Sequence, residues 1–170
     1  MPSKIYLDTS ILCALADPPA RSAYARTCQS LTRRWFRTLA HTRNLCTSTF
    51  ALNKIRQGPL ALASARLHVA EQLHLLSTEI VFTAQAELFL AGGGLKSDAA
   101  NLGSEIACAA HFGIELYVTW DWQQLEAQRL PFLHLMLEQA GLPQMDFISP
   151  LQLVENDYEA LQTAKGRRLS

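Results

Sequence analysis

The chain has 170 residues, with 15 basic and 15 acidic side chains and a formal net charge of zero. Its length fits one domain, and 49% apolar against 18% charged residues exclude a disordered or low-complexity protein. No apolar run approaches the roughly 20 residues of a membrane span, and the first ten residues lack the apolar core of a secretory signal. We therefore expect a cytoplasmic protein with no membrane partner.

The first half of the chain alternates between short apolar runs and helical patterns. Strands are predicted at 4–7 and 44–47, and helices at 9–16, 20–41 and 60–76. Between the second strand and the last of these helices, Thr47 or Ser48 can cap a further helix that runs to about residue 57.

The second half continues the alternation. Strands are predicted at 79–82, 115–119 and 145–148. Helices are predicted from Thr83 to about 91, from 98 to 112 behind a Ser97 cap, from Asp121 as a short turn or helix, at 131–140, and after Ser149-Pro150. Short apolar strands that alternate with helices indicate an α/β domain around a parallel sheet.

Charge is segregated along the chain. Asp17 is followed by no acidic residue until Glu71, and the nine basic residues between them give this stretch a local charge of +9. Such asymmetry favours an anionic partner such as a nucleic acid, although an Arg-rich solvated helix explains it equally well. The candidate nucleic-acid-binding residues are Arg33, Arg34, Arg37, Lys54 and Arg56.

Several acidic residues are placed to meet at one edge of the predicted sheet. Asp8 directly follows the first strand, and Asp121 follows the 115–119 strand. In a parallel sheet, sites form at the carboxyl ends of the strands. Asp98 and Glu105 lie two turns apart on the helix that leads into the 115–119 strand. Carboxylates gathered in this way suit Mg²⁺ or Mn²⁺, and such ions promote phosphodiester hydrolysis.

Each of these acids also has a purely structural interpretation. Asp8 and Asp121 can cap helices, and Asp98 suits the first turn of a helix because of the helix dipole. Glu105 fits a solvated helix face. The residue pattern alone leaves both interpretations open.

Three motifs resemble those of PIN-domain proteins, and in particular a VapC-like toxin and ribonuclease subgroup. They are Ile5-Tyr6-Leu7-Asp8-Thr9-Ser10, the segment 106–121 that ends in Thr119-Trp120-Asp121, and the segment 141–150. The resemblance implies a three-layer α/β/α domain with a central parallel sheet of about five strands. It assigns residues 1–155 to this PIN-like domain and leaves 156–170 as a polar, flexible tail.

The resemblance also implies which residues form the site. Asp8 and Asp121 match two of the family's four acids, with Thr9, Ser10 and Thr119 in support. Asn53 and Leu102 fall where the other two acids are expected, so the acidic cluster is degenerate. Glu105 falls where the subgroup has His, and Glu105 or Asp98 can substitute for the missing acids. The implied catalytic residues are Asp8, Glu105 and Asp121, and the implied metal ligands are these three with Asp98.

Three functions follow from these observations. The first is a Mg²⁺- or Mn²⁺-dependent endoribonuclease of the toxin–antitoxin type with a reduced acid site. The second is a catalytically inactive PIN domain that binds RNA or a protein. The third, a small-molecule phosphohydrolase, lacks the expected phosphate-binding motifs. The resemblance implies RNA and an antitoxin protein as partners and permits a homodimer.

Overall fold

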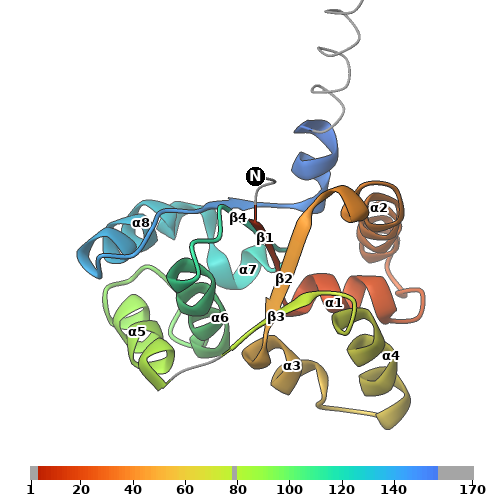
Figure 1. Cartoon of the computed structure of the whole chain (residues 1–170), viewed down its shortest axis with the longest axis horizontal. Coiled ribbons are helices and arrows are strands. Elements are labelled where there is room, and N and C mark those ends of the chain that lie inside the picture. Colours follow the sequence, from red (N-terminus) through yellow and green to blue (C-terminus); the bar gives the residue numbers. More distant parts are fainter. Residues whose placement is uncertain (1–3, 78–79, 157–170) are drawn as a thin grey trace, which may run out of the picture.

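Five short strands form one parallel sheet in the computed structural model, which describes residues 4–77 and 80–156 (Figure 1). The order across the sheet is β3-β2-β1-β4-β5. The strands are β1 (Lys4–Leu7), β2 (Asn44–Ser48), β3 (His74–Leu76), β4 (Leu116–Val118) and β5 (Asp146–Ile148). Since β1 is central, the residue that follows it lies between the carboxyl ends of β2 and β4. The predicted PIN-like α/β/α architecture with about five parallel strands is confirmed.

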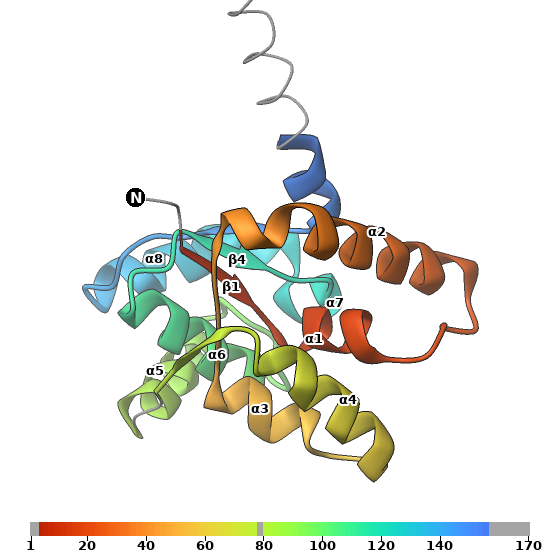
Figure 2. The ribbon, with the colours of Figure 1, turned by 45° about the vertical axis from the view of Figure 1, so that its right-hand side comes forward.

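Helices cover both faces of the sheet. The helices before β5 are, in chain order, α1 (Thr9–Ala16), α2 (Ala23–Leu39), η1 (Ala40–Thr42), α3 (Thr49–Ile55), α4 (Leu60–Ala70), α5 (Ile80–Ala91), α6 (Ala100–His111), α7 (Trp122–Leu125), η2 (Ala127–Arg129) and α8 (Leu130–Gln139). One face packs against α5, α6 and α8, and the other against α1 to α4. On the second face, α1 lies between α2 and α4 (Figure 2). No helix in the described part of the chain is long and apolar enough to cross a membrane.

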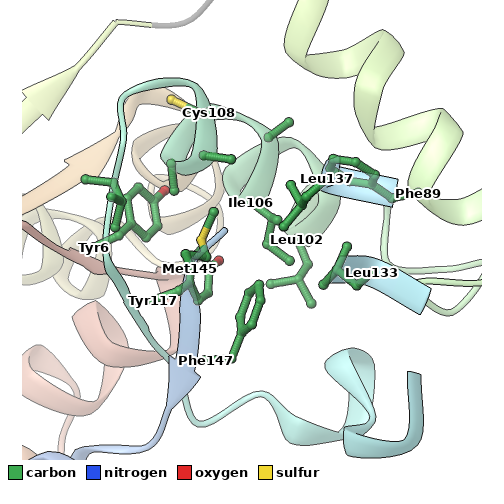
Figure 3. Close-up of a cluster of buried hydrophobic side chains, with 14 of the residues drawn as sticks. Tyr6, Phe89, Leu102, Ile106, Cys108, Tyr117, Leu133, Leu137, Met145 and Phe147 are labelled. Carbon is green, nitrogen blue, oxygen red and sulfur yellow. The ribbon is translucent and has the colours of Figure 1, made fainter. Parts of the chain in front are cut away.

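The strand side chains alternate between two apolar clusters, as the two-residue period of a strand requires. Tyr6, Tyr117 and Phe147 occupy one cross-strand row on the α6 face. The Tyr6 and Tyr117 rings stack with their centroids 5.0 Å apart, and both side chains are fully buried (Figure 3). Ile5 and Leu7 point to the other face, where they pack with α1 and α2. Burial on both faces explains why the strand patterns read as short apolar runs.

Several helix ends lie close to where the sequence predicts them. The Ser48 side chain accepts a hydrogen bond from Ala51 N, which confirms it as the N-cap of α3. Gly93, with φ of 75°, follows α5 in a left-handed conformation that suits glycine. Ser149 precedes a helix over 150–156, and its hydroxyl accepts from Gln152 N.

The third strand is where the sequence-based prediction is wrong. The helix predicted over 60–76 ends at Ala70, and residues 74–76 form β3 instead. The strand predicted over 79–82 is absent from its described part, because Ile80 begins α5. Three residues are too short for periodicity to reveal, and β3 owes its conformation to pairing with β2. The apolar run after it is helical because Phe82 packs into the α6-side cluster.

Two smaller corrections concern helix starts. Helix α6 begins at Ala100, with Ala99 as its N-cap and no side-chain cap, so Ser97 does not begin the helix and Asp98 precedes its first turn. The long helix predicted over 20–41 is α2 over Ala23–Leu39, followed by the short helix η1. The predicted flexible tail, 156–170, lies outside the described residues except for its first position.

Candidate active site at the carboxyl end of the sheet

Asp8 is the most constrained side chain at the end of the central strand. It is 2% exposed and serves as the N-cap of α1. Its Oδ1 accepts hydrogen bonds from Ser10 Oγ at 2.5 Å and from Ile11 N at 3.1 Å. Its Oδ2 accepts from Thr119 Oγ1 at 2.6 Å, which links the ends of β1 and β4. The structural and functional interpretations of Asp8 are therefore compatible, because the cap uses only part of the carboxylate.

Glu105 reaches the same edge of the sheet from the middle of α6. It is 2% exposed, so the solvated-face interpretation is wrong. Its Oε2 accepts from Tyr6 Oη at 3.1 Å and from the backbone N of Thr9 at 3.3 Å. Its Oε1 accepts from Thr9 Oγ1 at 2.7 Å and from Asn101 Nδ2 at 3.0 Å. Four donors thus hold one carboxyl group against the turn between β1 and α1.

The pKa values of both carboxyl groups are raised. Burial is the main cause for Asp8, whose pKa rises to about 6, and the charge of Asp121 adds to it. Burial also dominates for Glu105, whose pKa rises to about 8, with the charge of Asp8 second. Among the described residues, neither carboxylate forms an ion pair with Lys, Arg or His. The raised pKa values favour the protonated carboxyl groups, and no cationic side chain among the described residues offsets their charge when they ionise.

Asp121 lies beside Asp8 and is half-buried. It is the N-cap of α7, because its Oδ1 accepts from Gln124 N at 3.3 Å. Its own N donates to Thr119 Oγ1 at 2.8 Å, and the Thr119 hydroxyl in turn donates to Asp8. Thr119 therefore fixes the two aspartates relative to one another.

The other predicted acid positions do not join this group. Asp98 is exposed and precedes α6, and no described hydrogen bond or ion pair connects it to the site. Asn53 is exposed on α3, and no described hydrogen bond links it to Asp8 or Glu105. Leu102 is 4% exposed and lies in the apolar cluster among Leu133, Leu137 and Phe147 (Figure 3).

The hydrogen bonds that the carboxylates already accept limit how many of their oxygen lone pairs are free to bind a divalent cation. A carboxylate has about four lone-pair positions. Protein donors occupy four on Glu105 and three on Asp8. Within residues 4–77 and 80–156, no three His, Cys, Asp or Glu side chains gather closely enough to hold a metal ion. The residues fit a Mg²⁺ or Mn²⁺ held by Asp8 and Asp121 with water and substrate phosphates, and they do not fit a four-acid cage.

Two partners of the site were not singled out from the sequence. The Tyr6 hydroxyl donates to Glu105 and lies 2.6 Å from Ser48 Oγ. A tyrosine buried inside a strand needs a hydrogen-bond partner. This requirement is the sequence signal that could have identified Tyr6 as part of the site. Ser48 was recognised only as a helix cap.

The predicted nucleic-acid-binding residues lie on two helical segments of the α1–α4 side. Arg33, Arg34 and Arg37 lie on α2, and Arg33 also donates to the backbone oxygens of Leu15 and Asp17. Lys54 is half-buried near the end of α3, and Arg56 is exposed just after it.

Comparison with solved structures finds VapC and VapBC proteins of similar fold. VapC20 from Mycobacterium tuberculosis, described as a toxin that cleaves the sarcin–ricin loop, matches at a TM-score of 0.51 and 18% identity, over 69% of this chain and 90% of that one. VapBC2 from Rickettsia felis, bound to a DNA fragment from its promoter, matches at a TM-score of 0.55 and 12% identity, over 86% of this chain and 98% of that one. No family model matches the chain, and neither does any curated protein sequence. At these identities the likeness establishes the fold.

Proposed function

We propose that this protein is a cytoplasmic PIN-domain endoribonuclease of the toxin–antitoxin type, dependent on Mg²⁺ or Mn²⁺ and working with a reduced acid site. The observation that carries the proposal is Asp8, a buried carboxylate directly after the central strand that shares its surroundings with Asp121 and Glu105 and meets no described cation. Crowded carboxylates without a counter-ion favour a bound cation, since its charge offsets their repulsion.

In this proposal the residues divide the work between binding and positioning. Asp8 and Asp121 would hold the cation, which when bound would make water more acidic and offset charge on the phosphodiester. Thr119 and Ser10 hold the Asp8 carboxylate in one orientation through hydrogen bonds of 2.6 and 2.5 Å. Glu105 supports the catalytic residues: it ties α6 to Thr9 and keeps the β1–α1 turn in place.

The proposed substrate is RNA. Arg34, Arg37 and Arg56 are exposed, and the charge of their region suits a polyanion. The two similar structures support the toxin–antitoxin assignment, so we also propose an antitoxin protein as partner, and a homodimer as the arrangement to test by solution mass.

Cleavage of an end-labelled RNA with and without Mg²⁺ or Mn²⁺ tests the proposal. We expect cation-dependent cleavage that Asp8→Asn lowers by at least a hundredfold, since this change removes the buried charge and keeps the side-chain shape. Asp146→Asn is the matched control, because Asp146 is an exposed acid at the start of β5, outside the site. Equal cleavage by Asp8→Asn and the unmodified protein would overturn the proposal.

A second function, RNA binding without cleavage, is favoured by two specific observations. All four lone-pair positions of Glu105 are occupied by protein donors, and Leu102 is buried where another acid was expected. A non-cleaving protein would hold labelled RNA intact with either cation, and log affinity would fall as log salt concentration rises.

A further inference from the structure

A cavity at the opposite, amino-terminal end of the sheet has its own chemistry. It has a volume of about 570 Å³ and lies where the end of α2, η1, the start of β2 and the start of β3 meet. This volume is within the range of sites for small organic ligands. Ser48, which touches the acid site, is at the other end of β2 from the cavity-lining Asn44. The two residues are four positions apart along the strand, or about 13 Å.

The rim of this cavity is basic. Arg37, His41, Arg43 and His74 line it, and none of its lining residues is acidic. Glu71 adjoins the lining residue Gln72 in the chain, but its carboxylate lies 3.6 Å from His68 Nδ1 and does not line the cavity. No acidic side chain therefore lines the cavity to oppose the approach of an anion.

Arg37 is the rim residue best placed to bind such an anion. Its side chain is exposed, and its described hydrogen bond runs from Nε to the backbone oxygen of Arg33, one turn earlier on α2. No carboxylate among the described residues pairs with it. A guanidinium group suits phosphate oxygens because of its planar array of donors.

The other residues that line the cavity are uncharged. Phe36, Leu45 and Leu73 provide an apolar surface, and the exposed Asn44 and Gln72 add side-chain amides. An aromatic ring and aliphatic groups can hold the face of a flat heterocycle, while amides can donate to and accept from its edge. A ligand that fits both parts carries a phosphate and a base.

We propose that this amino-end cavity, built from Phe36, Arg37, Asn44 and His74 with their neighbours, is a binding site for a nucleoside monophosphate. The ligand is either a free nucleotide or the phosphorylated terminal nucleotide of an RNA strand. The site does not depend on the cleavage proposed above, since it lies at the other end of the sheet from Asp8.

Binding measurements on the full chain test this site, with adenosine 5′-monophosphate as the probe and inorganic phosphate and adenosine as separate controls. We expect the nucleotide to bind at least tenfold more tightly than either part alone. Arg37→Glu and His74→Glu should each weaken binding by about tenfold or more, as expected for loss of a charged contact. Arg21→Glu, an identical charge change at an exposed residue outside the cavity, should leave the affinity unchanged.

A short single-stranded RNA with a 5′-phosphate, compared with the same RNA carrying a 5′-hydroxyl, distinguishes the source of the ligand. Preference for the phosphorylated RNA over the free nucleotide identifies an RNA end, and the reverse identifies a nucleotide. The proposal is overturned if inorganic phosphate binds as tightly as the nucleotide, or if both Arg37→Glu and His74→Glu bind normally. It is also overturned if Asp8→Asn, and neither cavity variant, abolishes binding, because the nucleotide would then occupy the acid site.

Discussion

At the carboxyl end of the sheet, Asp8 and Glu105 are almost fully buried and held by protein donors, whereas at the amino end Arg37 and His74 are exposed around a cavity. Both ends carry charge, and the chain as a whole sums to zero. The two ends differ in the free energy needed to keep a charged group in its place. A buried carboxylate must be stabilised by hydrogen bonds or protonation, while an exposed guanidinium stays hydrated. We therefore expect substitutions at the two ends to affect stability very differently.

The largest effect is expected for Glu105→Ala. The substitution leaves a cavity and removes the acceptor of the Tyr6, Thr9 and Asn101 donors. We expect the free energy of unfolding at pH 6 to fall by about 4 kcal/mol. Urea denaturation measures it. Glu105→Gln is the matched control, because it keeps the volume and one acceptor oxygen. A loss below about 1 kcal/mol for Glu105→Ala would show that the network does not stabilise the fold.

The second-largest expected effect is a dependence of the free energy of unfolding on pH. The pKa of Glu105 is about 8 in the folded protein against an ordinary value of 4.5, so the folded state binds the proton more tightly than the unfolded state. Its contribution to stability is complete below pH 4.5 and is lost as the pH rises towards 8.

We expect this loss to be roughly 2–3 kcal/mol between pH 5 and 7, since one pKa unit of difference between the two states corresponds to about 1.4 kcal/mol. Urea denaturation of Glu105→Gln across the same range should show a much flatter profile, with the part due to Asp8 remaining below about pH 6. If Glu105→Gln and the unmodified protein gave identical profiles, a group other than Glu105 would cause the pH dependence.

A smaller effect distinguishes two stacked tyrosines. The Tyr6 hydroxyl donates to Glu105, whereas the buried Tyr117 hydroxyl has no hydrogen-bond partner in the described part of the chain. We expect Tyr6→Phe to cost about 1–2 kcal/mol and Tyr117→Phe to be neutral or stabilising, because an unpaired buried hydroxyl already carries its desolvation cost. Thermal and urea unfolding of the two variants give the comparison. Equal losses would contradict it.

The smallest effect is expected at the basic end. Arg37→Ala removes an exposed side chain whose described bond lies within its own helix, so stability should change by less than about 0.5 kcal/mol. Binding of RNA by this variant should show a shallower dependence on salt concentration, since one phosphate contact is lost. A large loss of stability would mean that the amino end is a structural centre like the carboxyl end.

Much of the site could be predicted from local pattern. An apolar run ending in Asp8-Thr9-Ser10 fixes a strand, a turn and a helix cap within a few residues, and the structure has all three. Asp121 as the cap of a short helix follows from the same local logic. These signals suffice because their hydrogen bonds join near neighbours in the chain.

What could not be predicted depends on contacts distant in sequence. Glu105 is buried because Tyr6 and Thr9, roughly 100 residues earlier, provide donors, and no helical period reveals this. Leu102 packs into the apolar cluster, and α6 begins at Ala100, so Asp98 lies ahead of the helix. The spacing of the acids in the sequence reveals neither fact. The same holds for β3, which is a strand because it pairs with β2.

The central position of β1 has a consequence for synthesis on the ribosome. One neighbour, β2, follows it by some 40 residues, but the other, β4, follows by roughly 110, which takes roughly 5–20 seconds at typical elongation rates. Until then one edge of β1 has no partner strand, and Asp8 lacks the Thr119 hydroxyl that orients it. The acid site is therefore completed late, when most of the chain has already been made. A nascent chain cut short before β4 would carry Asp8 without the hydrogen bond from Thr119 that fixes its orientation.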